Sequence, residues 1–131
     1  MSKAFDYLRE FGVFYLATNN AGAAAVRPFG AVSEKDGKLY IATGNFKEVY
    51  KQLGADGNVV LAATKAGTLT WLRVYGKAVE TKELADKEAM LAACPVLVKI
   101  FKEATNPVFA VFAIEVTKAE LHKDDGTVEI L

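Results

Sequence analysis

The hydrophobic positions of the chain fall into short apolar runs that are separated by turn residues. Apolar residues at helical spacing, with Ser2 as cap and Gly12 as stop, predict a first helix over residues 2–11. Asp36-Gly37 lies between two apolar runs and predicts a β-hairpin. The predicted strands cover residues 13–18, 23–34, 38–43, 58–64, 69–81, 108–122 and 128–131. The predicted helices cover residues 2–11, 46–54 and 82–93, with a further turn or two over 96–102.

These elements predict a mainly β fold, a β-barrel with flanking helices. About seven strands, mostly joined by hairpin-like turns, favour an antiparallel barrel with three or four helices at its rims. The strand spacing does not suit a doubly wound sheet, and no Gly-x-Gly-x-x-Gly follows the first predicted strand, so a Rossmann dinucleotide fold is disfavoured. No linker or repeat interrupts the pattern, so we expect a single domain over residues 1–131.

Composition narrows the classes of function. The 131 residues include 16 basic and 16 acidic ones, so the chain lacks the basic excess of a general nucleic-acid binder. One Cys, Cys94, and one His, His122, argue against an all-protein metal or haem site and leave no obvious Cys-His or Ser-His catalytic pair. We expect Cys94 to be buried and His122 to lie on the solvated surface. Without a signal-peptide core or a run of transmembrane length, we expect a cytoplasmic protein with no membrane partner.

A strand, a Thr-Gly-Asn turn and the predicted helix over residues 46–54 combine groups that suit a phosphate. Lys47 and Lys51 are four positions apart, which places them on one face of that helix. The start of a helix carries unpaired N–H groups and the positive end of the macrodipole, so several donors and two ammonium groups converge near one point. An ordinary interpretation also fits, because Asn45 and Glu48 have the spacing of a capping box and lysines are common on solvated helix faces.

Arg27, Pro28 and Phe29 lie inside the second predicted strand. Alternation places Arg27 and Phe29 on one face, between small residues. A flat ring could lie there, with Arg27 at its polar edge or at a phosphate. An Arg at a barrel rim beside a bulge fits equally well, and Pro28 favours such an irregularity because it cannot donate to a sheet ladder.

Trp71, Arg73 and Tyr75 alternate onto one face of a later predicted strand. Such a face is costly to leave in water and awkward in a dry core, so it suits a ligand wall or a subunit interface. The alternative is a set of cross-strand aromatic and cation pairs on the barrel surface.

The order of these segments resembles the FMN-binding split-barrel proteins related to pyridoxamine 5′-phosphate oxidase. The pieces that carry the resemblance are Gly12-Val-Phe-Tyr-Leu-Ala-Thr18, Val26-Arg-Pro-Phe-Gly-Ala-Val32, Leu39-Tyr-Ile-Ala-Thr-Gly-Asn45, Lys47-x-x-x-Lys51-Gln-Leu53 and Trp71-Leu-Arg73-x-x-Gly76. They occur in family order and at family spacing over nearly the whole chain. The resemblance is closest to the small members that are like nitroimidazole-resistance proteins.

The resemblance implies an antiparallel FMN-binding split barrel, a homodimer, and two FMN sites at the dimer interface. By position, three groups of residues would contact the cofactor. The residues beside the isoalloxazine and the ribityl chain would be Arg27, Pro28 and Phe29. The residues around the phosphate would be Thr43, Asn45, Lys47 and Lys51. Trp71 and Arg73 would approach from the neighbouring strand or from the other subunit.

Departures from the family pattern bear on the activity. Lys47-Glu48-Val49 stands where the true oxidases carry a denser Ser-Arg-Lys-type run, and residues 121–131 lack their Arg and His pair for the pyridoxal substrate. Vitamin B6 oxidation is therefore disfavoured. The first hypothesis is an FMN-dependent oxidoreductase that exchanges electrons with a small-molecule donor and acceptor. The alternatives are a non-catalytic flavin store, carrier or sensor, and a binder of the deazaflavin F420.

Overall fold

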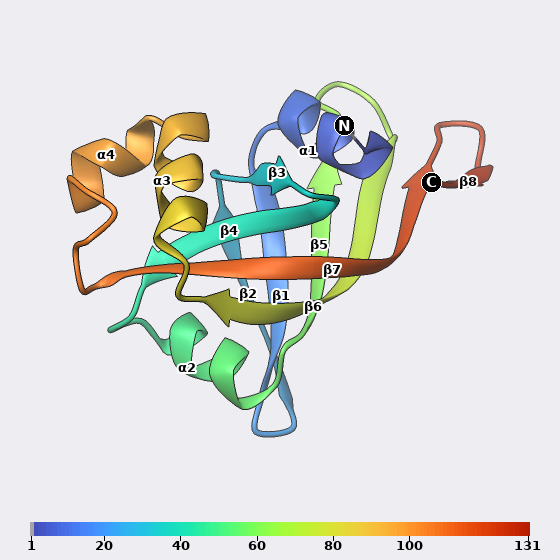
Figure 1. Ribbon diagram of the computed structural model, residues 1–131. Helices are drawn as coiled ribbons and strands as arrows, with labels where there is room; N and C mark the ends of the chain where they lie inside the picture. Colours follow the sequence, from blue (N-terminus) through green and yellow to red (C-terminus); the bar gives the residue numbers. More distant parts are fainter. Residues whose placement is uncertain (1) are drawn as a thin grey trace.

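The computed structural model describes residues 2–131 and contains eight strands and four helices within them (Figure 1). Met1, the first residue of the predicted domain, lies outside the described residues. The strands are β1 (Phe14–Asn20), β2 (Ala23–Phe29), β3 (Ser33–Lys35), β4 (Lys38–Gly44), β5 (Asn58–Thr64), β6 (Trp71–Thr81), β7 (Phe109–His122) and β8 (Val128–Ile130). The helices are α1 (Lys3–Phe11), α2 (Glu48–Ala55), α3 (Leu84–Ala93) and α4 (Val96–Phe101).

At the start of the chain and at the hairpin, the structure contains the elements that local sequence signals predict. The Ser2 hydroxyl accepts a hydrogen bond from the Phe5 N–H at 3.2 Å, and Gly12 ends α1 with a φ of 89° that suits glycine. Asp36 and Gly37 both have positive φ, 52° and 78°, and turn β3 into β4. Two positive φ values in a two-residue turn match the right-handed twist of the flanking strands, so this hairpin is confirmed.

Two of the differences between predicted and observed boundaries bear on the site. The run 23–34 is divided into β2 and β3, because the chain leaves the sheet at residues 30–32, and this division raises the strand count from about seven to eight. The second helix begins at Glu48 rather than at residue 46, with Lys47 in extended conformation (φ −84°, ψ 153°) as its N-cap. The N-cap is therefore Lys47 rather than Asn45, whose side chain bonds to Pro107 instead, so the capping box of Asn45 and Glu48 does not form.

All strand pairs are antiparallel, and the order of neighbours is β2-β1-β5-β6-β7-β4-β3, with β8 paired to β7. The sheet curls into a barrel, with α1 and α2 at its two ends (Figure 1). Among the described residues no ladder joins β2 to β4, so the barrel stays open between these two strands. The mainly β, antiparallel barrel predicted from the sequence is confirmed.

Alternation along the strands divides the apolar side chains between two cores. On β4, Leu39 and Ile41 face the barrel interior, whereas Tyr40 and Ala42 face outward toward α3 and α4. The fully buried large side chains of the interior are Leu8, Phe14, Leu16, Leu39, Ile41, Leu61, Leu72, Val74, Phe112 and Ile114. Cys94 is buried in the second core, as expected from the sequence.

Helices cover only part of the outer surface of the barrel. α3 packs on β4 and β7, whereas no described helix lies over the outer face formed by β1, β2, β5 and the start of β6 (Figure 1). Tyr15 and Val26 on this open face are 52% and 64% exposed. No helix in residues 2–131 has both the length and the apolar character needed to cross a bilayer.

Gly76 generates a prediction about stability. It lies at an irregularity in the β6–β7 ladder, where an added Cβ would stand 2.5 Å from Ile114 Cγ2 and 2.9 Å from the Glu115 carbonyl oxygen. Gly76→Ala is expected to lower the free energy of unfolding by about 1–3 kcal/mol, because the backbone must shift to relieve the clash. The measurement is urea unfolding.

The matched control is Gly54→Ala, in the last turn of α2, where nothing lies within 4 Å of an added Cβ. Ala has the higher helix propensity, so this variant should gain up to about 1 kcal/mol. Equal unfolding midpoints for the two variants would contradict the proposed clash.

Candidate functional site

A cavity of about 610 Å³ opens between β2 and β4, where the barrel is not closed. This volume lies within the range of small-molecule and cofactor pockets, roughly 300–1,000 Å³. The lining comes from residues 27–31, 42–44, 46, 47, 49, 96, 97, 100, 101 and 108. It therefore combines the end of β2, the end of β4, the start of α2 and one side of α4.

One end of this cavity collects groups that bind anions. Lys47 and Thr43 line it, and Thr43 is only 6% exposed. The N–H groups of Glu48 and Val49 begin α2 and find no acceptor among residues 2–131. Unpaired helix amides and the positive end of the macrodipole favour an anion here.

Arg27 lines the same cavity and ties three elements together. Its Nη1 donates to the Leu16 carbonyl oxygen at 3.1 Å and to the Thr18 hydroxyl at 2.8 Å, and its Nη2 donates to Gln52 Oε1 at 2.7 Å. The Thr18 hydroxyl donates to the same Gln52 oxygen at 2.5 Å. β2, β1 and α2 are thus joined through one guanidinium.

The environment of Arg27 leaves it charged and partly available. Burial lowers the pKa of the Arg27 guanidinium, but arginine titrates so far above neutrality that the charge remains. Three hydrogen bonds occupy three of its five N–H donors, so two remain for a ligand. Because a guanidinium only donates, the Gln52 amide must turn its oxygen toward Arg27.

Five of the nine residues predicted at the cofactor line this cavity, and four do not. The five are Arg27, Pro28, Phe29, Thr43 and Lys47. Asn45 lies between two lining residues, but its side chain donates to the Pro107 carbonyl oxygen at 3.0 Å and fixes the turn to the chain before β7. Lys51 faces solvent on α2, where it pairs with Glu48 at 3.3 Å. Lys47 and Lys51 therefore do not share a helix face, because Lys47 precedes the helix.

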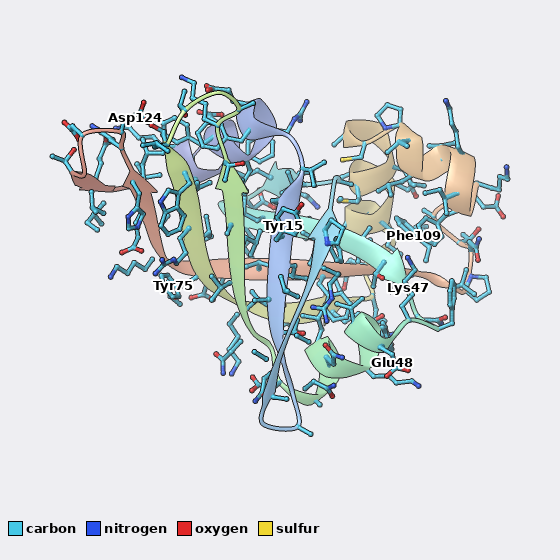
Figure 2. All side chains as sticks on the ribbon, turned by 180° about the vertical axis from the view of Figure 1, so that it is seen from behind. Tyr15, Lys47, Glu48, Tyr75, Phe109 and Asp124 are labelled. Atoms are coloured by element: carbon cyan, nitrogen blue, oxygen red, sulfur yellow. The ribbon has the colours of Figure 1, made fainter. Side chains whose placement is uncertain are left out.

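Trp71 and Arg73 lie at the other end of the barrel. Thr43 is paired with Ala110 at one end of β7, whereas Trp71 is paired with His122 at its far end. Figure 2 likewise labels Lys47 and Tyr75, which bonds to Arg73, on opposite sides of the molecule. Within one chain, Trp71 and Arg73 do not reach the cavity.

The predicted face of Trp71, Arg73 and Tyr75 forms a connected ladder. The Arg73 guanidinium carbon lies 4.7 Å from the centre of the Trp71 ring, and Arg73 Nη1 donates to the Tyr75 hydroxyl at 2.9 Å. The His122 ring stacks on Trp71 with centres 4.0 Å apart. His122 is a quarter exposed, so it reaches the surface as expected but is partly covered by Trp71.

Glu120 balances the charges of this ladder. Its carboxylate lies 3.3 Å from His122 Nε2, 3.3 Å from Lys118 Nζ and 3.7 Å from Arg73 Nη1. The hydrogen bond with His122, followed by the contacts of Lys118 and Arg73, lowers the pKa of Glu120 below its ordinary value. Arg73 is thus held by a hydrogen bond and a nearby carboxylate.

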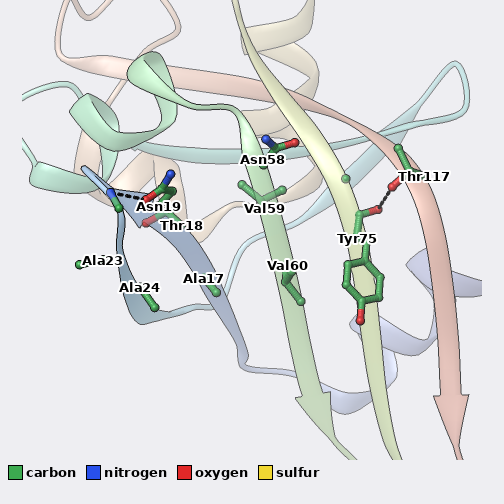
Figure 3. Close-up of a pocket in the computed structure, with 12 residues that line it drawn as sticks. Ala17, Thr18, Asn19, Ala23, Ala24, Asn58, Val59, Val60, Tyr75 and Thr117 are labelled. Carbon is green, nitrogen blue, oxygen red and sulfur yellow. Dashed lines mark hydrogen bonds between the residues drawn. The ribbon is translucent and has the colours of Figure 1, made fainter.

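A second cavity, of about 570 Å³, lies on the open face of the sheet (Figure 3). Side chains of β1, β2, β5 and β6 line it, among them Ala17, Ala24, Val60 and Tyr75. Its lining holds no Lys, Arg, Asp or Glu, so nothing there favours a charged ligand. Within residues 2–131, no cluster of three His, Cys, Asp or Glu residues could hold a metal ion.

Sequence reasoning missed Thr18 and Gln52, the two buried partners of Arg27. Gln52 is 9% exposed and lies on the apolar side of α2 with Val49 and Leu53. A polar residue inside an apolar helical stripe was a signal that it meets a buried polar partner. The sequence did not reveal which strand would supply that partner.

The structure of the chain is similar to those of known proteins, among them the following three. A NimC/NimA family protein of Clostridium acetobutylicum is 34% identical, with a TM-score of 0.87 over 98% of this chain and 91% of that one. A putative pyridoxamine 5′-phosphate oxidase of Listeria innocua is 16% identical, with a TM-score of 0.71 over 98% and 95%. A heme binding protein of Mycobacterium smegmatis is 19% identical, with a TM-score of 0.74 over 100% and 58%.

The likeness to the second and third structures concerns the fold alone. No protein-family model matches the chain, and no curated protein matches it by sequence.

The hydrogen bonds of Gln52 generate a prediction. Gln52→Ala is expected to lower the free energy of unfolding by about 1–3 kcal/mol, because Thr18 and Arg27 lose a buried acceptor. Gln52→Glu is the control, since its carboxylate keeps an acceptor for both donors. Urea unfolding at neutral pH should place Q52E near the wild type. A Q52A midpoint equal to that of Q52E would refute the role of this acceptor.

Proposed function

Because the chain belongs to the NimC/NimA family, we propose that it binds FMN in the cavity between β2 and β4 and acts as an FMN-dependent oxidoreductase. Its fold is the split barrel of pyridoxamine 5′-phosphate oxidase-like proteins, as the sequence resemblance implied. The fold by itself does not specify the cofactor or the reaction, so the proposal rests on the chemistry of the cavity.

One observation carries the proposal: a threonine hydroxyl, a lysine and unpaired helix amides lie along a cavity of cofactor size. Thr43, Lys47 and the first N–H groups of α2 would bind the phosphate of FMN. Arg27 would add charge-assisted hydrogen bonds from its two remaining donors. The other end of the cavity is lined mainly by apolar side chains, which suits a flat ring system.

The donor set favours a phosphorylated cofactor over haem. No His, Cys, Met or Tyr is among the residues that line the cavity, so the common axial ligands of haem iron are lacking there. His122 is engaged by Trp71 and Glu120 on another part of the barrel. The heme binding neighbour therefore supports the shared fold but not a shared ligand. F420, which also carries a phosphate, remains the alternative cofactor.

The chemistry that FMN would supply is electron transfer, and the chain would supply binding and orientation. The apolar side chains around the cavity would exclude water from a bound cofactor, and Arg27 holds β2 in place against β1 and α2. Thr43 is the one lining residue with a hydroxyl, and no lining side chain is a carboxyl, imidazole, thiol or phenol. The cavity thus offers positioning and positive charge rather than general acid–base groups.

We propose further that the protein forms a homodimer, in which two copies pair through the open face of the sheet. Tyr15 and Val26 are exposed there, beside the second cavity and beside the ladder of Trp71 and Arg73. Burial of such a face by a second copy removes apolar surface from water. Since Trp71 and Arg73 do not reach the cavity of their own chain, they would contact the cofactor of the partner.

A second function, a non-catalytic flavin store, carrier or sensor, is favoured by the lack of acid–base side chains among the lining residues. Anaerobic mixing of the FMN-loaded protein with NADH or NADPH separates the two functions. Bleaching of the flavin absorbance followed by reoxidation by an added acceptor indicates an oxidoreductase. A spectrum that stays oxidised with both nicotinamides favours the storage function.

The proposed phosphate site predicts how removal of the Lys47 charge changes the affinity for flavins. Lys47→Ala is expected to weaken FMN binding by about ten- to a hundredfold and riboflavin binding by less than about threefold, because only FMN carries the phosphate. Titration of the apoprotein with each flavin, followed by fluorescence, provides both dissociation constants.

The control is Lys51→Ala, which removes the same charge from the outer side of α2. It should leave both dissociation constants within about twofold of the wild type. Equal losses for FMN and riboflavin in K47A, or a loss in K51A as large as in K47A, would remove the phosphate from this end of the cavity.

The proposed dimer surface predicts how a substitution at Val26 changes the oligomeric state. Val26→Glu introduces a charge into the open face and is expected to convert the protein to a monomer, because an unpaired carboxylate is costly to bury. The control is Val79→Glu, a valine with the same 64% exposure that lies instead near Tyr50 and Gly54 of α2. Sedimentation velocity measures both. Monomeric wild type, or a V26E dimer as stable as the wild type, would contradict this interface.

A further inference from the structure

The Trp71 ring is held by two neighbouring side chains. The His122 ring, directly opposite on β7, stacks on it with ring centres 4.0 Å apart and 12° between the ring planes. The Arg73 guanidinium carbon lies 4.7 Å from the centre of the same ring. A tryptophan that is only partly buried on a strand otherwise keeps rotamer freedom. These two contacts therefore restrict the orientation of the ring.

The neighbours of Trp71 on the β5 side are small. Thr64 and Ala62 of β5 pair with Trp71 and Arg73, and their side chains reach only a short way from the sheet. Among residues 2–131, the ring that stacks on Trp71 is that of His122. The orientation of the Trp71 ring thus depends mainly on what β7 places beside it.

His122 is itself held in place. Its Nε2 lies 3.3 Å from a carboxylate oxygen of Glu120 on the same strand. Glu120 is buried, and the hydrogen bond with His122, followed by the contacts of Lys118 and Arg73, lowers the pKa of the Glu120 carboxyl. Glu120 is therefore ionised at neutral pH. A carboxylate bound to one ring nitrogen fixes the orientation of a histidine, so Glu120 acts on Trp71 through His122.

A stacked cross-strand pair is also an ordinary way to stabilise a sheet. Its surroundings here favour an additional role. Leu72 faces the barrel interior, whereas its neighbours Trp71 and Arg73 lie on the outer face, away from that core. Arg73 is fixed there as well, by its hydrogen bond to the Tyr75 hydroxyl. An aromatic plane and a charge that are fixed before binding lose less entropy when they meet a ligand.

We propose that His122 is a positioning residue, which stacks on Trp71 and fixes its ring in the orientation that meets the FMN held by the partner chain. This inference rests on the proposed function, because the flavin and the homodimer both come from it. It deepens that function by adding a residue that acts on the cofactor through Trp71, without touching the cofactor.

The first measurement concerns the ring alone. Trp71 is the one tryptophan of the chain, so intrinsic fluorescence reports on this ring without interference. Time-resolved anisotropy of the ligand-free protein measures how far the ring rotates. His122→Ala is expected to at least about double the amplitude of sub-nanosecond rotation, because the stacking partner is lost. His122→Phe should stay near the wild type, since its ring still stacks.

His122→Phe also separates stacking from hydrogen bonding, because both variants lose the bond to Glu120 and only H122A loses the stacked ring.

The second measurement concerns the cofactor. H122A is expected to weaken FMN binding by about three- to tenfold, and H122F should restore it. A tryptophan in contact with a flavin quenches flavin fluorescence, so bound FMN should fluoresce more in H122A, toward the level of Trp71→Phe. In the W71F background, H122A should change FMN affinity by less than about twofold, because a residue that acts through Trp71 has nothing left to position.

The matched control is Lys123→Ala. Lys123 follows His122 in the chain but pairs with Glu129 at 3.1 Å instead of contacting Trp71. It should leave the anisotropy and the FMN affinity of the wild type unchanged. Unchanged ring rotation in H122A, an H122A effect on FMN as large in W71F as in the wild type, or equal effects of K123A and H122A would overturn the positioning role.

Failure of the proposed function is seen separately. Wild-type protein that does not retain FMN, or that sediments as a monomer, refutes the contact between Trp71 and the flavin of the partner chain. The anisotropy of the ligand-free protein then still decides whether His122 orients the Trp71 ring. A dimer that retains FMN and shows neither change in H122A refutes the positioning role alone.

Discussion

The structure depends on a barrel that does not close. β2 stands at one end of the order of strands and β4 lies near the other, and no ladder joins them among the described residues. Backbone N–H and C=O groups at such an edge need partners, and a ligand is one source of them. The larger of the two cavities that bear on function lies in this opening. The same open edge therefore supplies the space for a cofactor and the free backbone groups that would contact it.

A buried polar network keeps the opening in a defined shape. Arg27 on β2 bonds to Thr18 on β1 and to Gln52 on α2, so the edge strand is anchored to its neighbour and to the helix. The same helix presents its first N–H groups to the cavity. Arg27 thus influences the site in two ways, as a charge in its lining and as the link between its walls. Unpaired polar groups in a low-dielectric interior are costly, which makes such a network specific.

The two outer faces of the barrel differ in what covers them. α3 and α4 cover the face of β4 and β7, and apolar side chains of α4 also line the cavity. The face of β1, β2, β5 and β6 is left to a second copy in the proposed dimer. With Trp71 and Arg73 on that face, far from the cavity of their own chain, dimerisation and cofactor binding become parts of one arrangement. This arrangement gives a reason for a conspicuous Trp-Arg-Tyr ladder outside the cavity.

The sequence by itself determined the type of fold and most of its elements. Period-two alternation, the Asp36-Gly37 turn and the Ser2 cap are local signals, and each formed the structure that it predicts, since local sterics and hydrogen bonds determine them. The alternation of Trp71 and Arg73 likewise revealed their shared face. Five of the nine predicted cofactor residues line one cavity, because the ordered resemblance holds over nearly the whole chain.

Only the tertiary structure decided which of those residues meet. Lys47 and Lys51 look equivalent in the sequence, but α2 begins after Lys47, so one lysine lines the cavity and the other pairs with Glu48 in solvent. The partners of Arg27 come from residues 9 and 25 positions away in the chain, a pairing that no local pattern encodes. His122 is sheltered because β7 places it against Trp71. For Arg27 and His122 the deciding contacts join different elements of the fold, and packing rather than local propensity selects them.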